Sequence, residues 1–269
     1  EGMASIIEKP TLWDESGTQS AQIQAELLQQ VQGGPLGYRL RRVILTNFWL
    51  YEHQVIEIPH GRLFLAGDNQ SGKSTVLIAA ITLALDGDTH PERIDTFGKR
   101  EKRIDYYVIG SNESNTPFLR DQRTSYIALE FEWCSPELPP FSSEARAYWE
   151  RGEFDKARFL TIGLALYGNR NNATPISISR FLITDGSRLE KDIHTIHTQG
   201  DTSRATDLRT FKKIINEHGI VCDTQREYEQ KVSQYLFNFA SVEDFHRLIR
   251  LLLYLRQPNL NSVLSLETI

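Results

Sequence analysis

The most constraining feature of the sequence is a short stretch that follows an apolar segment. It runs Gly67-Asp68-Asn69-Gln70-Ser71-Gly72-Lys73-Ser74-Thr75 and matches the phosphate-loop pattern G-x-x-x-x-G-K-[ST] at every fixed position. Residues 63–66 before it are apolar enough for a strand buried on both faces, and residues 73–85 predict an apolar helix. A strand, a tight loop and a helix in this order are the context that the motif requires.

The chemistry that this motif predicts is phosphate binding. Gly67 and Gly72 let the backbone curl so that successive N–H groups point at one anion, and the helix N-terminus adds partial positive charge there. Lys73 is predicted to bridge the β- and γ-phosphates as the catalytic cation, and the Ser74 hydroxyl to bind Mg²⁺. An ordinary glycine- and serine-rich turn is the alternative, but the flanking strand and helix favour a nucleotide-binding site.

Composition excludes several other classes of protein. The chain has 269 residues, of which 40% are hydrophobic and 24% charged, so it is expected to fold around a core rather than stay disordered. No run approaches the roughly 20 apolar residues of a membrane span. The net charge is −5, so any contact with DNA requires a local basic patch. Two cysteines, Cys134 and Cys222, stand far apart and predict neither a disulfide framework nor a cysteine-based zinc site.

Three segments are expected along the chain. Residues 1–35 form a leader with a short amphipathic helix, in which Glu1 and Gly2 before Met3 are expected to be a cloning remnant. Residues 36–206 form a phosphate-loop lobe with an insertion at about 136–156, and residues 207–269 form a helical lobe that leads toward a coiled-coil arm. The strands expected in the middle segment are residues 38–45, 54–58, 63–66, 126–133, 159–167 and 176–184.

This pattern predicts an α/β fold, a mixed sheet with antiparallel strands around the phosphate-loop helix. Residues 51–53 are expected to form a turn before the second strand, and residues 86–88 to stop the helix. In residues 126–133 apolar side chains alternate with Glu130 and Glu132, which predicts a strand with one buried face.

Capping signals predict helices in the last segment. From Asp207 onward apolar residues recur at helical spacing, and Gly219 stands where a C-terminal cap is expected. Thr224 begins a capping box with Glu227, and Ser241 is expected to cap a further helix.

Three features help to choose among kinases, GTPases and ATPase motors. Two expected strands precede the strand of the loop, whereas small-molecule kinases usually open with strand and loop. No Asn-Lys pair is present, so the guanine reader of a GTPase is missing, and no strand leads into the Asp-x-x-Gly match at residues 95–98. No four-residue apolar run is followed by Asp-Glu, so the carboxylates that hold Mg²⁺ and polarise water are missing; residues 181–186 come nearest. The chain is therefore expected to carry half of an active site.

Residues 38–265 resemble the N-terminal head segment of SMC, SbcC and RecF ATPases, which have ABC-type heads. The similarity is carried by residues 45–48 and by the loop with Asn69, where Gln70 stands in place of the usual glycine. Within this superfamily the chain is most similar to the bacterial MukB/MksB-like branch, particularly to the JetC-type ATPases of Wadjet plasmid-defence systems. The narrower similarity is carried by Arg103, Tyr106, Tyr107, Gly110, residues 126–131 and residues 255–260.

The resemblance implies the N-terminal part of the ATP-binding head of an SMC-like motor that extrudes or clamps DNA loops in plasmid defence. ATP with Mg²⁺ would drive head engagement, and hydrolysis would drive release. In this family a coiled coil separates the halves of the head, and the second half supplies a Ser-Gly-Gly signature and an Asp-Glu pair. The chain is expected to be a truncated or split head, an ATPase only when completed by that half and dimerised.

The implied partners follow from the same resemblance. They are the C-terminal half of the head, a second SMC-like subunit in an ATP-dependent homodimer, a kleisin with kleisin-binding subunits, a nuclease subunit and double-stranded DNA. The implied location is the cytoplasm of a bacterium, at the nucleoid, without a membrane contact.

Two further sets of residues receive roles from the resemblance. The family has a glutamine that contacts Mg²⁺ and the attacking water, and Gln257 is the candidate by position; a surface glutamine before Pro258 is the alternative. The densest basic cluster is expected either to be solvated or to contact DNA phosphates, and its two arginines have nucleotide contact as a third option. Its members are Lys99, Arg100, Lys102 and Arg103.

Other functions stay open at this point. A RecF- or SbcC-like DNA-repair ATPase is the alternative within the superfamily. A stand-alone phosphate-loop kinase is the rival from another class, and a nucleotide-gated scaffold without turnover is a third. His194 and His197 have the spacing of a zinc-ligand pair, but a solvated loop explains them better.

Overall fold

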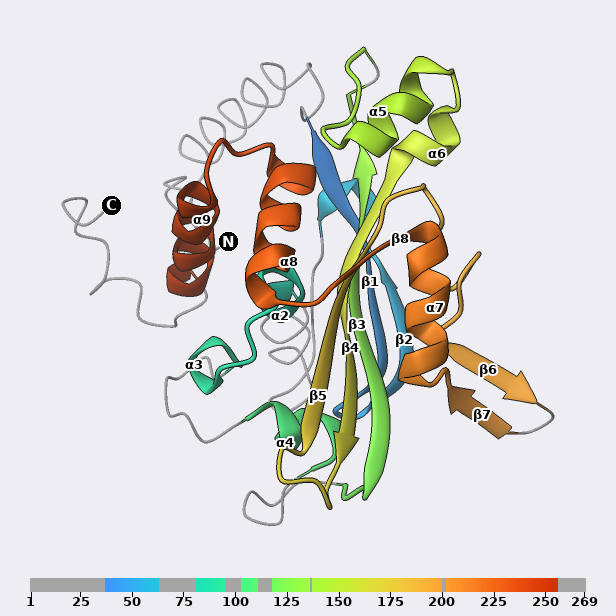
Figure 1. Ribbon diagram of the computed structural model, residues 1–269, viewed down its shortest axis with the longest axis vertical. Helices are drawn as coiled ribbons and strands as arrows, with labels where there is room; N and C mark the ends of the chain where they lie inside the picture. Colours follow the sequence, from blue (N-terminus) through green and yellow to red (C-terminus); the bar gives the residue numbers. More distant parts are fainter. Residues whose placement is uncertain are drawn as a thin grey trace, which may run out of the picture. The chain divides into compact units, whose positions relative to one another are not determined.

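The fold is built on a six-stranded sheet with the strand order β2-β1-β3-β4-β5-β8 (Figure 1). The computed structural model describes residues 37–62, 81–94, 103–110, 118–135, 137–199 and 202–255. Every pairing in the described part of the sheet is antiparallel. The strands are β1 (Tyr38–Phe48), β2 (Tyr51–Glu57), β3 (Gln122–Trp133), β4 (Phe159–Asn169), β5 (Ile176–Ile183) and β8 (Gly219–Cys222).

Helices cover both faces of this sheet, and a small hairpin lies beside it (Figure 1). The hairpin pairs β6 (Ile196–Gln199) with β7 (Thr202–Ala205). The helices are η1 (Pro59–Gly61), α2 (Leu83–Asp86), α3 (Pro91–Ile94), α4 (Ile104–Val108), α5 (Ser143–Glu150), α6 (Phe154–Arg158), α7 (Leu208–His218), α8 (Gln225–Val232), the π-helical turn η3 (Ser233–Phe237) and α9 (Val242–Leu255). Among the described residues, no helix is both long and apolar enough to cross a membrane.

The core has two parts, one on each face of the sheet. The larger part joins the sheet to α2, α4, α8 and α9, and the smaller part joins it to α7. On the α7 side the ring of Phe211 lies 4.6 Å from that of Tyr126 and 5.0 Å from that of Phe181, measured between centroids. Because helices cover both faces, the central strands are buried on both sides.

This two-sided burial corrects the expectation for β3. The strand was expected to have one buried face, but its residues from Ser125 to Trp133 are all buried, including Glu130 and Glu132. The physical reason is that each carboxylate has arginine partners. Glu132 lies beside Arg39, Arg41 and Arg158.

Glu130 is fully buried between two arginines. Arg42, which is 2% exposed, donates from Nε to Glu130 Oε1 at 2.8 Å and makes a second bond from its NH2 group. Arg188 donates from Nε and NH2 to the same carboxylate at 3.1 and 2.6 Å, and its guanidinium lies 4.0 Å from the ring centre of Phe159. Burial alone would raise the pKa of Glu130, but the hydrogen bonds and charges of both arginines outweigh it and hold the pKa below its ordinary value.

Most expected elements are confirmed in the described residues. Strands expected at 38–45, 126–133, 159–167 and 176–184 are present, several of them longer than expected. The caps expected at Thr224 and Ser241 are also present, and each side chain accepts a hydrogen bond from a backbone N–H in the first turn of its helix. Asp207, where the helical segment was expected to begin, caps α7 in the same way. The leader and residues 63–66 lie outside the described residues, and the division into three segments stays a prediction.

Two local expectations are wrong. Residues 51–53, expected as a turn, belong to β2, because β1 continues to Phe48 and pairs it with Tyr51. Gly219 is not a helix cap; its φ of 176° is extended, and it begins β8, which pairs with β5 inside the region expected to be helical. A Cβ on Gly219 would lie 2.0 Å from the carbonyl oxygen of Leu182, so this close strand approach requires glycine.

We expect Glu130→Gln to destabilise the chain by about 3–5 kcal/mol, because the buried guanidinium of Arg42 and the partly buried one of Arg188 lose their counter-charge. The measurement is urea unfolding at pH 7 followed by circular dichroism. The matched control is Glu153→Gln, which removes the exposed partner of Arg151 and Lys156 and should leave the midpoint unchanged. Equal midpoints for the two variants would contradict the role assigned to the buried pair.

Candidate functional site

Most of the residues that the sequence places in the site lie outside the described residues. These are the phosphate loop at 67–75, Gln257, and Lys99, Arg100 and Lys102. Of the predicted site residues only Arg103 is described. The surroundings of the loop are described on both sides, from β1 to Arg62 before it and from Ile81 onward after it.

The helix expected after the loop is described at its C-terminal end. Residues 81–82 are helical, and α2 continues the helix to Asp86 with every residue of α2 buried. Gly87 ends the helix in the left-handed conformation at φ 68°, and its N–H donates to the carbonyl of Leu83 at 2.8 Å. The stop expected at 86–88 is therefore confirmed.

Side chains from two other elements hold the end of α2. The Tyr228 hydroxyl of α8 donates to the carbonyl of Ala84, and Arg180 of β5 donates from Nε to the carbonyl of Gly87 at 2.9 Å. Burial raises the pKa of Tyr228 well above its ordinary value, so this hydroxyl keeps its proton. A Cβ on Gly87 would lie 2.8 Å from the Tyr228 ring, so the contact also requires glycine. The end of the helix is fixed to the sheet and to α8.

Asp86 is a buried carboxyl at this helix end. Its Oδ1 accepts from the Asp88 N–H at 2.9 Å, while its Oδ2 accepts no hydrogen bond within the described part of the chain and lies 3.7 Å from Arg93 Nε. Burial raises the pKa of Asp86 to about 7, although the Asp88 N–H and the Arg93 charge act in the opposite direction. Asp86 therefore exchanges its proton near neutral pH. The sequence indicated only a helix stop here.

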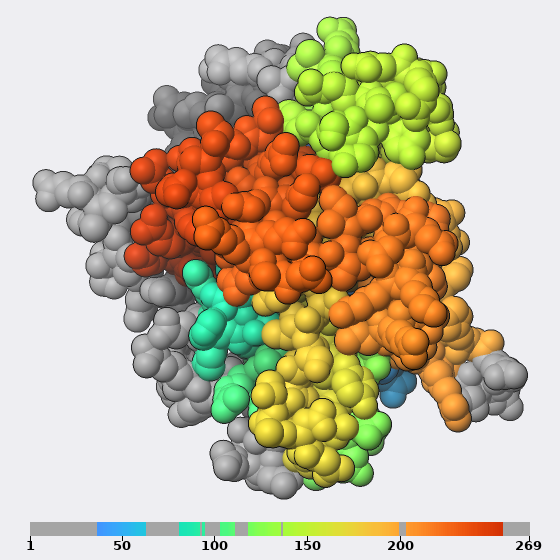
Figure 2. All heavy atoms as spheres, in the orientation of Figure 1, coloured from blue at the N-terminus to red at the C-terminus, as the bar shows by residue number. Residues whose placement is uncertain are grey.

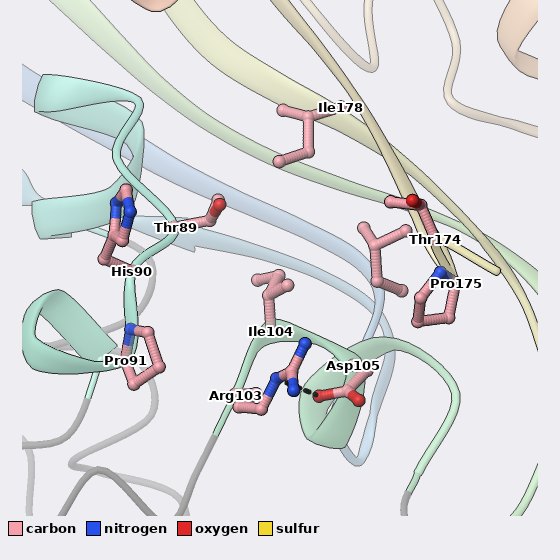
Figure 3. Close-up of a pocket in the computed structure, with 10 residues that line it drawn as sticks. Thr89, His90, Pro91, Arg103, Ile104, Asp105, Thr174, Pro175 and Ile178 are labelled. Atoms are coloured by element: carbon pink, nitrogen blue, oxygen red, sulfur yellow. Dashed lines mark ion pairs between the residues drawn. The ribbon is translucent and has the colours of Figure 1, made fainter.

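Arg103 lies at the edge of a cavity of about 380 Å³ between the segment after α2, the start of α4 and the start of β5 (Figure 3). Its Nε is 4.0 Å from Asp105 Oδ1, and the two side chains face each other across the cavity edge. The walls are largely aliphatic and come from Pro91, Ile104, Pro175, Ile176 and Ile178. The Arg103 side chain is 68% exposed, so it can reach an external anion at little cost in desolvation.

Neither a metal cluster nor a relay at His218 is formed within the described ranges. No group of three His, Cys, Asp or Glu side chains there is placed to hold a metal ion. His218 Nδ1 lies 2.8 Å from Asp185 Oδ2 and 3.1 Å from Ser187 Oγ. A Ser-His-Asp triad uses one ring nitrogen for the serine and the other for the aspartate, so these three residues do not form one.

The expected solvated loop at His194 and His197 is only partly present. His197 lies in β6 and is exposed, whereas His194 precedes the strand, with Nδ1 at 3.6 Å from Glu190 Oε2. The sequence does not predict β6 because Ile196 is its one apolar residue and the strand shows no apolar alternation.

Comparison with known proteins adds one finding. A family model described as an AAA domain (AAA_23) matches residues 42–264, and this domain is found in SMC/SbcC/RecF-type P-loop ATPases. No curated protein matches the chain. The matched range includes the phosphate loop, Arg103 and the whole described sheet except the first residues of β1.

We expect Asp86→Asn to remove a pH dependence of stability. The pKa of Asp86 is about 7 in the folded chain and 3.8 in an ordinary carboxyl group. Its protonated form therefore stabilises the fold fully below pH 3.8, and this contribution is lost as the pH rises through about 7. Asn stays neutral and keeps the acceptor for the Asp88 N–H. The variant should therefore gain on the wild type, on the order of 4 kcal/mol between pH 4 and pH 8.

The measurement is the free energy of unfolding in urea for both proteins across this range, compared as a difference so that histidine titration cancels. Asp155→Asn on the exposed side of α6 is the control and should show no such trend. Parallel curves for wild type and Asp86→Asn would show that Asp86 titrates normally.

Proposed function

Because the chain belongs to the AAA domain family that is found in SMC/SbcC/RecF-type P-loop ATPases, we propose that it is the N-terminal part of the ATP-binding head of an SMC-like DNA-organising motor. The observation that carries the proposal is the complete phosphate-loop motif at residues 67–75 inside the matched range 42–264. The narrower proposal is a JetC-type subunit of the MukB/MksB-like branch that acts in plasmid defence.

The described fold supports nucleotide binding in this position. A mostly antiparallel sheet with helices fits a P-loop ATPase, and the helix that should follow the loop ends where the sequence predicts. Its last carbonyls are held by Tyr228 and Arg180, so the helix has a fixed base. In the proposed site, a helix held at this end would present its first N–H groups to a phosphate in a preorganised arrangement.

Within the proposed site each residue has one task. The N–H groups of the loop and Lys73 hold the phosphates, Ser74 binds Mg²⁺, and Gln257 orients the attacking water. Bound Mg²⁺ supplies charge neutralisation on the phosphates. Lys99, Arg100, Lys102 and Arg103 are proposed as contacts to the DNA backbone.

The proposed cycle requires partners. The C-terminal half of the head supplies the missing carboxylates, a second SMC-like subunit engages when ATP is bound, and hydrolysis releases it. A kleisin with its binding subunits and a nuclease complete the proposed assembly on double-stranded DNA in the bacterial cytoplasm. A RecF- or SbcC-like repair ATPase would use the same half-site.

We expect Lys73→Ala to weaken ATP·Mg²⁺ binding at least about tenfold, because the bound polyphosphate loses its main point charge. Isothermal titration of this chain, alone and with the complementing C-terminal half, measures it. Lys156→Ala is the control, since that exposed ammonium pairs with Glu153 at 2.6 Å on the surface of α6. An unchanged dissociation constant for Lys73→Ala would contradict the proposed site.

We expect this chain alone to hydrolyse ATP negligibly, because the sequence holds no strand-borne Asp-Glu pair. Phosphate release by the purified chain, before and after addition of the C-terminal half, measures it. Robust turnover by the chain alone that disappears in Lys73→Ala would instead identify a self-contained ATPase or kinase.

A further inference from the structure

Helix α7 carries three cations on its outer face. Arg209, Lys212 and Lys213 line a shallow hollow of about 440 Å³ together with Leu208 and Asn216. Figure 2 shows this helix, in orange, at the surface of the molecule. These cations lie outside the phosphate loop and the basic cluster at residues 99–103, and the proposed nucleotide site does not use them.

None of the three cations has a carboxylate partner among the described residues. Two acidic residues stand at the ends of the helix. Asp207 uses its Oδ1 to accept the Thr210 N–H at 3.0 Å as the N-cap, and Glu217 lies in the last turn. The middle of the outer face is therefore a positive patch in a protein whose net charge is negative.

The patch is held on a rigid base. The opposite face of α7 buries Phe211 and Ile215, which are 1% and 0% exposed, against the sheet. At its end, the His218 carbonyl accepts the Thr184 N–H at 3.1 Å. The helix cannot rotate without opening this core, so the cations keep their arrangement. Arg209 and Lys213 are separated by about 6 Å along the helix axis.

The chemistry of the patch selects its partner. The large exposed hydrophobic side chains of the described part of the chain are Leu50, Leu119, Leu138, Phe154, Leu251 and Tyr254, and none lies on α7. A membrane-surface helix would present its apolar face, which here is buried, and protein interfaces are depleted in lysine and have an apolar centre. Leu208 and the aliphatic stems of the cations line the hollow itself, while the charged ends of Arg209, Lys212 and Lys213 can reach a row of phosphates.

We propose that the outer face of α7 binds the phosphate backbone of double-stranded DNA. The choice of DNA rests on the proposed function, whereas the need for a polyanion rests on the patch itself. Contacts to phosphates carry no sequence information, so binding should be independent of sequence and strongly dependent on salt.

The test compares two triple variants of this chain. R209Q/K212Q/K213Q removes the patch, and R146Q/R226Q/R250Q removes three exposed cations that are dispersed over α5, α8 and α9. Glutamine keeps a high helix propensity, and the change in net charge is the same in both. Fluorescence anisotropy with a labelled 30-base-pair DNA duplex is recorded between 20 and 200 mM KCl.

Removing the patch should lower affinity at 50 mM KCl at least about tenfold and flatten the slope of log K against log salt by about 2.7, which is 0.9 for each phosphate contact. The dispersed variant should match the wild type. Lys212→Gln and Lys213→Gln alone, each expected to flatten the slope by about 0.9, keep the test valid if the triple variant does not fold.

Three outcomes with the variants and competitors would overturn the inference. They are an unchanged slope, an equal loss in both triple variants, and binding to polyglutamate instead of DNA. A wild-type chain that binds ATP but no DNA at 20 mM KCl would also overturn it and leave the proposed function standing. Loss of ATP binding in Lys73→Ala with intact DNA binding would leave this inference in place, so the two failures are distinguishable.

Discussion

The pairing of Glu130 with Arg42 and Arg188 is the interaction on which the rest of the fold depends. A carboxylate in the middle of a central strand prevents close packing on that face unless its charge is compensated. Two guanidiniums supply this compensation, one from β1 and one from the segment after β5. With the charge neutralised, α7 packs on this face while α2, α8 and α9 pack on the other. The same pairing thus allows a sheet that is buried on both sides. One face carries α7 with the proposed DNA contact, and the other carries α2, which lies next in the chain to the proposed nucleotide site.

Local signals explain which parts of the fold could be predicted. The strands β1, β4 and β5 are rich in apolar residues, and the caps at Thr224 and Ser241 act within one helical turn. Both kinds of signal are local, so they can be recognised without the tertiary structure. In contrast, β8 has four residues, and its pairing is decided by the free edge of β5 far earlier in the chain. The five residues of α4 are too few to show a helical period.

The candidate site shows the same limit. The phosphate loop is predictable because its ligands are consecutive backbone N–H groups and a few fixed side chains within one short segment. The behaviour of Asp86 was not predictable, because its burial comes from elements elsewhere in the chain. For α7 a signal was present: once Phe211 and Ile215 are assigned to the core, Arg209, Lys212 and Lys213 must lie on the opposite face. The sequence cannot show, however, that no carboxylate from the described residues forms an ion pair with them.

The two proposed sites are joined by one continuous stretch of chain. From α7 the chain passes directly into the edge strand β8 and then into α8, whose Tyr228 donates to the Ala84 carbonyl of α2. Rigid elements in series carry displacement, but energetic coupling also requires a group with two discrete states that both sites bias. Asp86 offers two such states, protonated and ionised, because it lies at the held end of α2 and burial raises its pKa to about 7; a bias by both sites is what pH-dependent coupling would reveal. If nucleotide and DNA affect each other through this stretch, their coupling should therefore vary with pH around 7, and it should lose that variation when Asp86 is replaced by Asn.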